Sequence, residues 1–164
     1  MVSVKLQDII DNFEQQHKLY GDMAELSATQ LEILQDWNGN DSLQKALANV
    51  MTRRQKLMQE IIAVNSENQR WQQEVCGQWE IGAFTISQLR GKAEQEQLQR
   101  LEQVVQHLGT ILEQINESDR QNQSLMSNLT APGTRSAPGT PVRTSAANAA
   151  YRQAMEQGKR KDEQ

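Results

Sequence analysis

Apolar residues recur at alternating steps of four and three over three stretches of the chain, which is the spacing of packed α-helices. The first stretch runs from residue 6 to residue 34. Its seam consists of Leu6, Ile10, Phe13, His17, Tyr20, Ala24, Ser27, Leu31 and Leu34. Further apolar residues widen this stripe, so we expect the first helix to contact more than one neighbouring helix. They are Ile9, Met23, Leu26 and Ile33.

The sequence DWNGND is expected to end the first helix, because Gly39 between two Asn residues readily adopts a turn conformation. Asp41 can then cap a second helix, with Gln44 three residues further on as in a capping box. This helix spans roughly 38 residues, or about 57 Å. Its seam continues without a slip through Leu43, Leu47, Val50, Arg54, Leu57, Ile61, Val64, Asn68, Trp71 and Val75.

The sequence GQWEIGAFT interrupts the pattern and is expected to form a second turn that plugs the bundle end with Trp79, Ile81 and Phe84. A third helix then begins at Thr85 or Ser87. Its seam runs through Leu98, Leu101, Val105, Leu108, Leu112, Ile115, Asp119, Asn122, Met126 and Leu129. Three long helices joined by short turns alternate in direction, so residues 1–129 are predicted to form an all-α, elongated, antiparallel and coiled-coil-like three-helix bundle.

The apolar stripe of the third helix lapses at Asp119 and Asn122 and then resumes. A continuous third helix from residue 85 to residue 129 would be about 68 Å long and would overshoot the second helix by about seven residues. In this interpretation the two polar residues lie where the bundle ends and water enters. Leu125, Met126 and Leu129 then lack intrachain partners and form a docking surface. The alternative is that the polar seam residues only fix the register and that the helix end frays.

Residues 130–164, the C-terminal tail, contain all three prolines and a duplicated APGT. This Pro/Gly/Ser-rich composition buries too little apolar surface to offset the entropy of ordering, so we expect the tail to be mostly disordered. Near residues 146–158 helix-forming residues return, with Tyr151 and Met155 one turn apart. Either a short helix that forms against a partner or a frayed tail is consistent with this segment.

Charge is distributed unevenly along the chain. The tail carries six basic and three acidic residues, which leaves 11 basic and 18 acidic residues, a charge of -7, before it. An acidic bundle repels phosphate backbones, so nucleic acid is not an expected partner. The hydrophobic fraction of 37% with 4% aromatic residues also argues against a thick globular core.

The sequence offers no candidate for catalysis. Cys76 is the only cysteine, so no intramolecular disulfide can form and a reducing cytoplasm is the expected location. His17 and His107 lie on different predicted helices and belong to no metal-binding motif, and no phosphate-binding glycine loop is present. No signal peptide or run of about 18 apolar residues is found, so we expect no membrane insertion. We therefore expect no enzyme activity, metal or cofactor.

The order of these features resembles the FlgN family of flagellar type III export chaperones over roughly residues 6–129. The resemblance rests on QQHKLYGDMAELSATQLEIL in the first helix, on a charged second helix, on a TISQL restart and above all on the Asn-rich NESDRQNQSLMSNL at the end of the third helix. The apolar turn GQWEIGAFT and the tail from Thr130 depart from the family pattern.

The resemblance implies a non-catalytic cytoplasmic chaperone. Members of the family bind hook-associated proteins, which join the flagellar hook to the filament, prevent their premature assembly and help to deliver them to the type III export apparatus. It also implies client contact near the end of the last helix and beyond, the region that the overshoot argument reaches independently. The predicted client-binding residues are Asn122, Leu125, Met126, Leu129, Tyr151 and Met155.

Two other functions remain open at this stage. A generic coiled-coil scaffold or adaptor would bury the same apolar surface in a stable oligomer. A histidine phosphotransfer module is also a helical bundle, and HKLYG at His17 faintly matches one, although His17 falls on a seam position. The sequence does not decide between a monomer and a homodimer.

Overall fold

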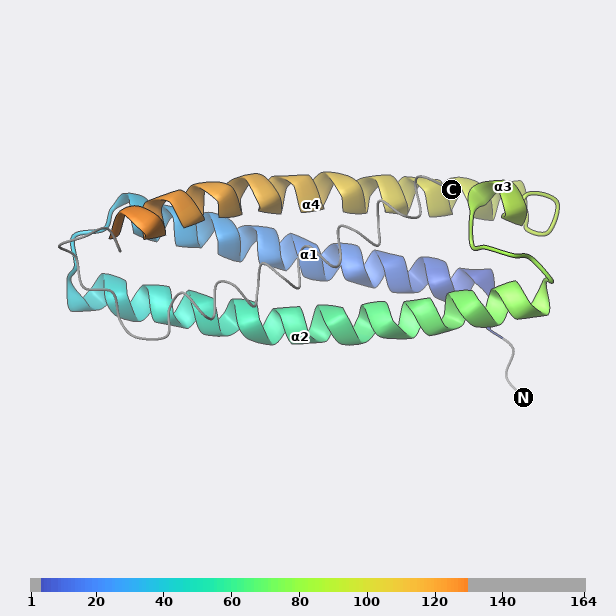
Figure 1. Ribbon diagram of the computed structural model, residues 1–164, viewed down its shortest axis with the longest axis horizontal. Helices are drawn as coiled ribbons and strands as arrows, with labels where there is room; N and C mark the ends of the chain where they lie inside the picture. The colour runs from blue at the N-terminus through green and yellow to red at the C-terminus, as the bar shows by residue number, and fades with distance from the viewer. Residues whose placement is uncertain (1–3, 130–164) are drawn as a thin grey trace.

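The computed structural model describes residues 4–129, which form an all-α bundle of three long helices and one short helix (Figure 1). The helices are α1 (Leu6–Gln35), α2 (Asp41–Gln78), α3 (Ile86–Leu89) and α4 (Gln95–Leu129). The predicted fold class and the alternating directions of the long helices are confirmed. The predicted helix near residues 146–158 lies outside the described residues.

Helix α1 lies between α2 and α4 and packs against both (Figure 1). Helices α1 and α4 run parallel, since Arg100 bonds to Gln7 at one end and Met126 bonds to Gln30 at the other. Helix α2 runs antiparallel to both. The expectation that the first helix contacts more than one neighbour is therefore confirmed.

The centre of the buried stripe on α1 differs from the predicted seam. Gln16 and Gln30 are buried, whereas the predicted seam residues His17 and Leu31 are only half-buried. The physical reason is that two helices cover α1, so the most buried line lies between the two contact faces. The apolar pattern missed this line because it includes polar side chains.

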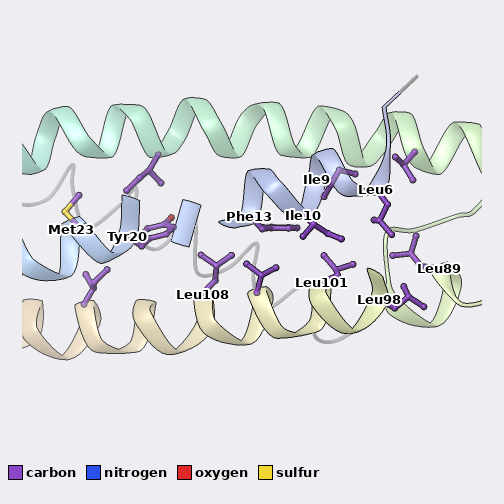
Figure 2. Close-up of a cluster of buried hydrophobic side chains, with 14 of the residues drawn as sticks. Leu6, Ile9, Ile10, Phe13, Tyr20, Met23, Leu89, Leu98, Leu101 and Leu108 are labelled. Atoms are coloured by element: carbon purple, nitrogen blue, oxygen red, sulfur yellow. The ribbon is translucent and has the colours of Figure 1, made fainter. Parts of the chain in front are cut away.

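The apolar core runs along the contacts of α1 with its two neighbours (Figure 2). Leu89 of α3 is completely buried and closes one end of this core. Trp79, Ile81 and Phe84 pack against the same end, which confirms the predicted plug. Among the described residues no helix is long and apolar enough to cross a membrane.

The first turn caps α2 one residue earlier than predicted. Gly39 has a φ of 78°, and Asn40 is the N-cap because its side-chain oxygen accepts a hydrogen bond from the Leu43 amide at 2.8 Å. The prediction that Asp41 is the cap is wrong. Asp41 is the first helical residue, where its negative charge favours the positive end of the helix dipole.

The second turn is longer than predicted and shortens the last helix. Thr85 caps α3, but Gly91, with a φ of 85°, lies in the break that follows it, and α4 begins only at Gln95. Helix α4 has 35 residues against 38 in α2. The prediction of a continuous helix from residue 85 that overshoots α2 is therefore wrong.

The buried residue Tyr20 is expected to make the stability of the bundle depend on pH. Its side chain is buried, and burial raises its pKa from 10.0 to about 12. Above pH 10 the unfolded chain releases the phenol proton while the native protein retains it. We expect the free energy of unfolding to fall between pH 10 and pH 12 by about 2–3 kcal/mol from this group. Urea denaturation across this range should show the fall in wild type and in Tyr151→Phe. A parallel fall in Tyr20→Phe would contradict the assignment.

Candidate functional site

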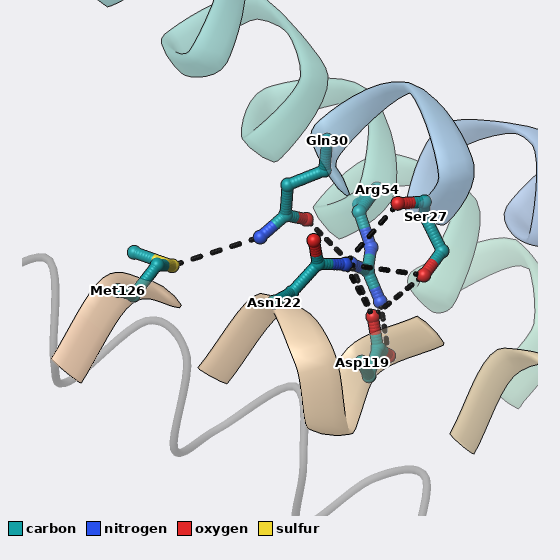
Figure 3. Close-up of polar contacts among 6 residues, drawn as sticks. All are labelled: Ser27, Gln30, Arg54, Asp119, Asn122 and Met126. Carbon is teal, nitrogen blue, oxygen red and sulfur yellow. Dashed lines mark hydrogen bonds and ion pairs between the residues drawn. The ribbon is translucent and has the colours of Figure 1, made fainter. Parts of the chain in front are cut away.

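Five polar residues from all three long helices form a buried cluster, which we call the polar layer (Figure 3). At its centre Arg54 of α2 and Asp119 of α4 form a bidentate ion pair, with N–O distances of 2.8 and 2.6 Å. The two side chains are only 9% and 12% exposed. The other members are Ser27, Gln30 and Asn122.

The remaining members of the polar layer form hydrogen bonds with the two charged side chains. Arg54 also donates to the Gln30 side-chain oxygen at 2.5 Å, and the Ser27 hydroxyl donates to Asp119 at 2.8 Å. The Asn122 amide donates to the Ser27 carbonyl oxygen at 3.1 Å and to Asp119 at 3.3 Å. Because a shift along the helix axes would separate this buried charge pair from its partners, we expect the polar layer to help fix the axial register of the three helices.

The two polar residues that interrupt the apolar stripe of α4, Asp119 and Asn122, therefore lie inside the bundle. Asp119 is 9% exposed and Asn122 is 2% exposed, so the interpretation that both lie where water enters is wrong. The reason is that α4 begins late, which leaves its last third beside Ser27 and Gln30 of α1. The alternative that these polar residues fix the register fits their burial and stays a prediction. Contact of Asn122 with a client stays a prediction that requires the polar layer to open.

The apolar residues that resume the stripe lie in the last two turns of α4. Leu125, Met126 and Leu129 are half-buried. Met126 has an intrachain contact, because the Gln30 side-chain amide donates to its sulfur at 3.6 Å (Figure 3). The expectation that this residue lacks an intrachain partner is therefore wrong. Tyr151 and Met155, the other predicted client-binding residues, lie outside the described residues.

A second buried polar cluster joins α1 to α2 nearer the other end of the bundle. The Asn68 amide donates to the Asn12 side-chain oxygen at 2.8 Å, and Gln72 donates to Asn68. The Asn12 amide in turn donates to the Val64 carbonyl oxygen at 3.0 Å. The seam pattern placed Asn68 in the interior but gave no signal for its partners.

The two histidines face each other across α1 and α4. Their ring centroids are 5.8 Å apart, and His17 is half-buried, which corrects its predicted place on the seam. Within residues 4–129 no group of three potential metal-binding side chains is found. Burial raises the pKa of the half-buried Cys76 thiol, which reduces its thiolate fraction and its nucleophilicity near neutral pH.

Comparison with known proteins identifies the family. The FlgN family, described as FlgN protein, matches residues 1–131. This range includes the whole bundle with both buried polar clusters and the last turns of α4. Comparisons with curated proteins and with solved structures give no match. A match over most of the chain, together with the all-α bundle, places the protein among the flagellar export chaperones: the chain belongs to the FlgN family.

Proposed function

We propose that this chaperone binds hook-associated proteins in the cytoplasm, prevents their premature assembly and aids their delivery to the type III export apparatus. The family match over residues 1–131 carries this proposal, since it supports a chaperone of flagellar export. The particular clients, their delivery and the cytoplasmic location come from the resemblance that the sequence shows to the family. No catalytic group takes part, because holding a client requires only a complementary surface.

The proposed client surface is the end of α4. Leu125, Met126 and Leu129 keep part of their apolar surface accessible there. An amphipathic helix of the client can lay its apolar face across these three side chains. The flexible, polarizable side chain of Met126 suits clients of different shape. Tyr151 and Met155 follow on the same chain and are proposed to cover the client from the other side.

The polar layer holds α4 in place next to the proposed client surface. It lies directly before the last two turns of α4 and ties Asp119 and Asn122 to α1 and α2. The turns that carry Leu125 and Leu129 therefore start from a fixed position, which reduces the entropy lost when a client binds. The Gln30–Met126 contact is a weak N–H···S bond that a client can displace.

A titration tests the proposed surface. We expect terminal segments of hook-associated proteins from the same source to bind the full chain saturably in isothermal calorimetry. The double variant Leu125→Glu, Leu129→Glu should bind about 100-fold more weakly, because two apolar contacts worth about 3 kcal/mol together are lost. Circular dichroism checks that the variant keeps its helices.

The matched control adds the same charge elsewhere. Ile62 is 49% exposed on α2 and Ala63 beside it is also exposed, so Ile62→Glu, Ala63→Glu changes the net charge equally. This control should bind like wild type. Equal weakening of binding in both double variants would contradict the proposal that the client binds at the end of α4. Absence of binding by wild type to every such segment would overturn the proposed clients.

A further inference from the structure

A pocket of about 340 Å³ opens at the end of the bundle that carries α3, far along α4 from Leu125. Its lining is mostly apolar and includes Phe13 of α1, Phe84 and Leu89, and Leu101 and Val105 of α4. Pockets that hold small molecules begin at about 300 Å³, so this one has room for one or two large side chains. Neither the polar layer nor the proposed client surface uses it.

The tail is the part of this chain that the family does not account for. The FlgN match ends at residue 131, whereas the chain continues to Gln164. Within this extension Tyr151 and Met155 are the only large apolar side chains after Val142, and they are four residues apart. In a helix this spacing puts both on one face, next to the basic residue Arg152.

The length of the chain allows this segment to reach the pocket. From Leu129 back to Val105 the path along α4 is about 36 Å. The linker of residues 130–150 can span about 70 Å when extended, nearly twice that path. Within the segment, Arg152 follows Tyr151 directly and can pair with Glu102, which is exposed in the pocket lining.

We propose that, in the client-free protein, residues 146–158 dock back on their own bundle and insert Tyr151 and Met155 into the pocket beside α3. The tail then serves as an intramolecular ligand at the end of the bundle opposite the client surface. This inference does not depend on the identity of the client. It explains why an apolar pocket can persist at the surface of a bundle in which Ile62 is the only exposed large hydrophobic residue within residues 4–129.

Disulfide trapping in the full chain tests the contact. In a Cys76→Ser background, Gln106→Cys at the exposed edge of the pocket is combined with Ala154→Cys, which leaves Tyr151, Arg152 and Met155 in place. The control pair combines Ala154→Cys with Gln114→Cys. Gln114 is also exposed on α4 and is closer to the tail along the chain, but it does not line the pocket.

We expect the Gln106→Cys pair to form an intramolecular disulfide about tenfold faster than the control pair under mild oxidation, because docking raises the local concentration of the tail thiol. Adding Tyr151→Ser and Met155→Ser should reduce this rate to that of the control. Non-reducing electrophoresis and mass spectrometry give the rates. Equal rates in the two pairs would overturn the proposal. So would a disulfide between chains whose yield rises with protein concentration, which would mean that a second copy fills the pocket.

Discussion

Replacing Arg54 by Met is expected to lower the free energy of unfolding by about 3–5 kcal/mol, as measured by urea denaturation. The variant leaves the Asp119 carboxylate in a site where its side chain is 12% exposed and its strongest donor is missing. Ser27 and Asn122 still donate to Asp119, but they do not neutralise its charge. The neighbouring Arg53 is exposed, so Arg53→Met provides the control and should change stability by less than about 0.5 kcal/mol.

A double variant separates the value of the ion pair from the cost of breaking it. Arg54→Met, Asp119→Leu removes both charges, and well-packed apolar pairs are often as stable as the ion pairs they replace. We therefore expect most of the lost stability to return. A double variant as unstable as the sum of the two single variants would give zero coupling energy between Arg54 and Asp119, and would contradict the explanation by an orphaned charge.

The helices were predictable because their signals are local. Spacing of apolar residues located α1 and α2 nearly to their ends, and it placed Arg54 and Asn68 on the buried seam despite their polarity. The break before α4 was missed because it depends on the residues between Leu89 and Gln95, where a single Gly91 in a left-handed conformation ends the short helix α3. This difference of a few residues removed the predicted overhang.

The candidate site was predictable only in part, because its partners depend on axial register. A heptad pattern states which face of α4 is buried but does not state which level of α2 lies opposite Asp119. That level is set by the length of two turns, and the pairing of Arg54 with Asp119 joins residues 65 positions apart. The burial of Gln16 and Gln30 was not predicted for a different reason. The pattern considers only apolar residues, whereas these glutamines are buried with their side chains hydrogen-bonded.

Asn68→Ala is expected to lower the free energy of unfolding by about 3–4 kcal/mol. Asn68 is completely buried and its side chain connects Asn12 of α1 with Gln72 on its own helix. Its removal leaves the Gln72 amide without this acceptor and creates a cavity between α1 and α2. Asn49 is exposed on the same helix, so Asn49→Ala should leave the urea midpoint nearly unchanged.

Replacing the whole second buried polar cluster by Leu tests whether its polar side chains determine the register of α1 and α2. Gln16 belongs to this cluster too, because its side-chain amide donates to the Asn12 side-chain oxygen at 2.8 Å. The variant Asn12→Leu, Gln16→Leu, Asn68→Leu, Gln72→Leu leaves no member of the cluster orphaned, so its free energy of unfolding should equal or exceed that of wild type. If the cluster specifies register, the amide NMR spectrum of this variant should show several sets of resonances, because α1 can slide along α2 when only apolar contacts remain. A single sharp set of resonances would show that this cluster is not needed to hold α1 and α2 in register.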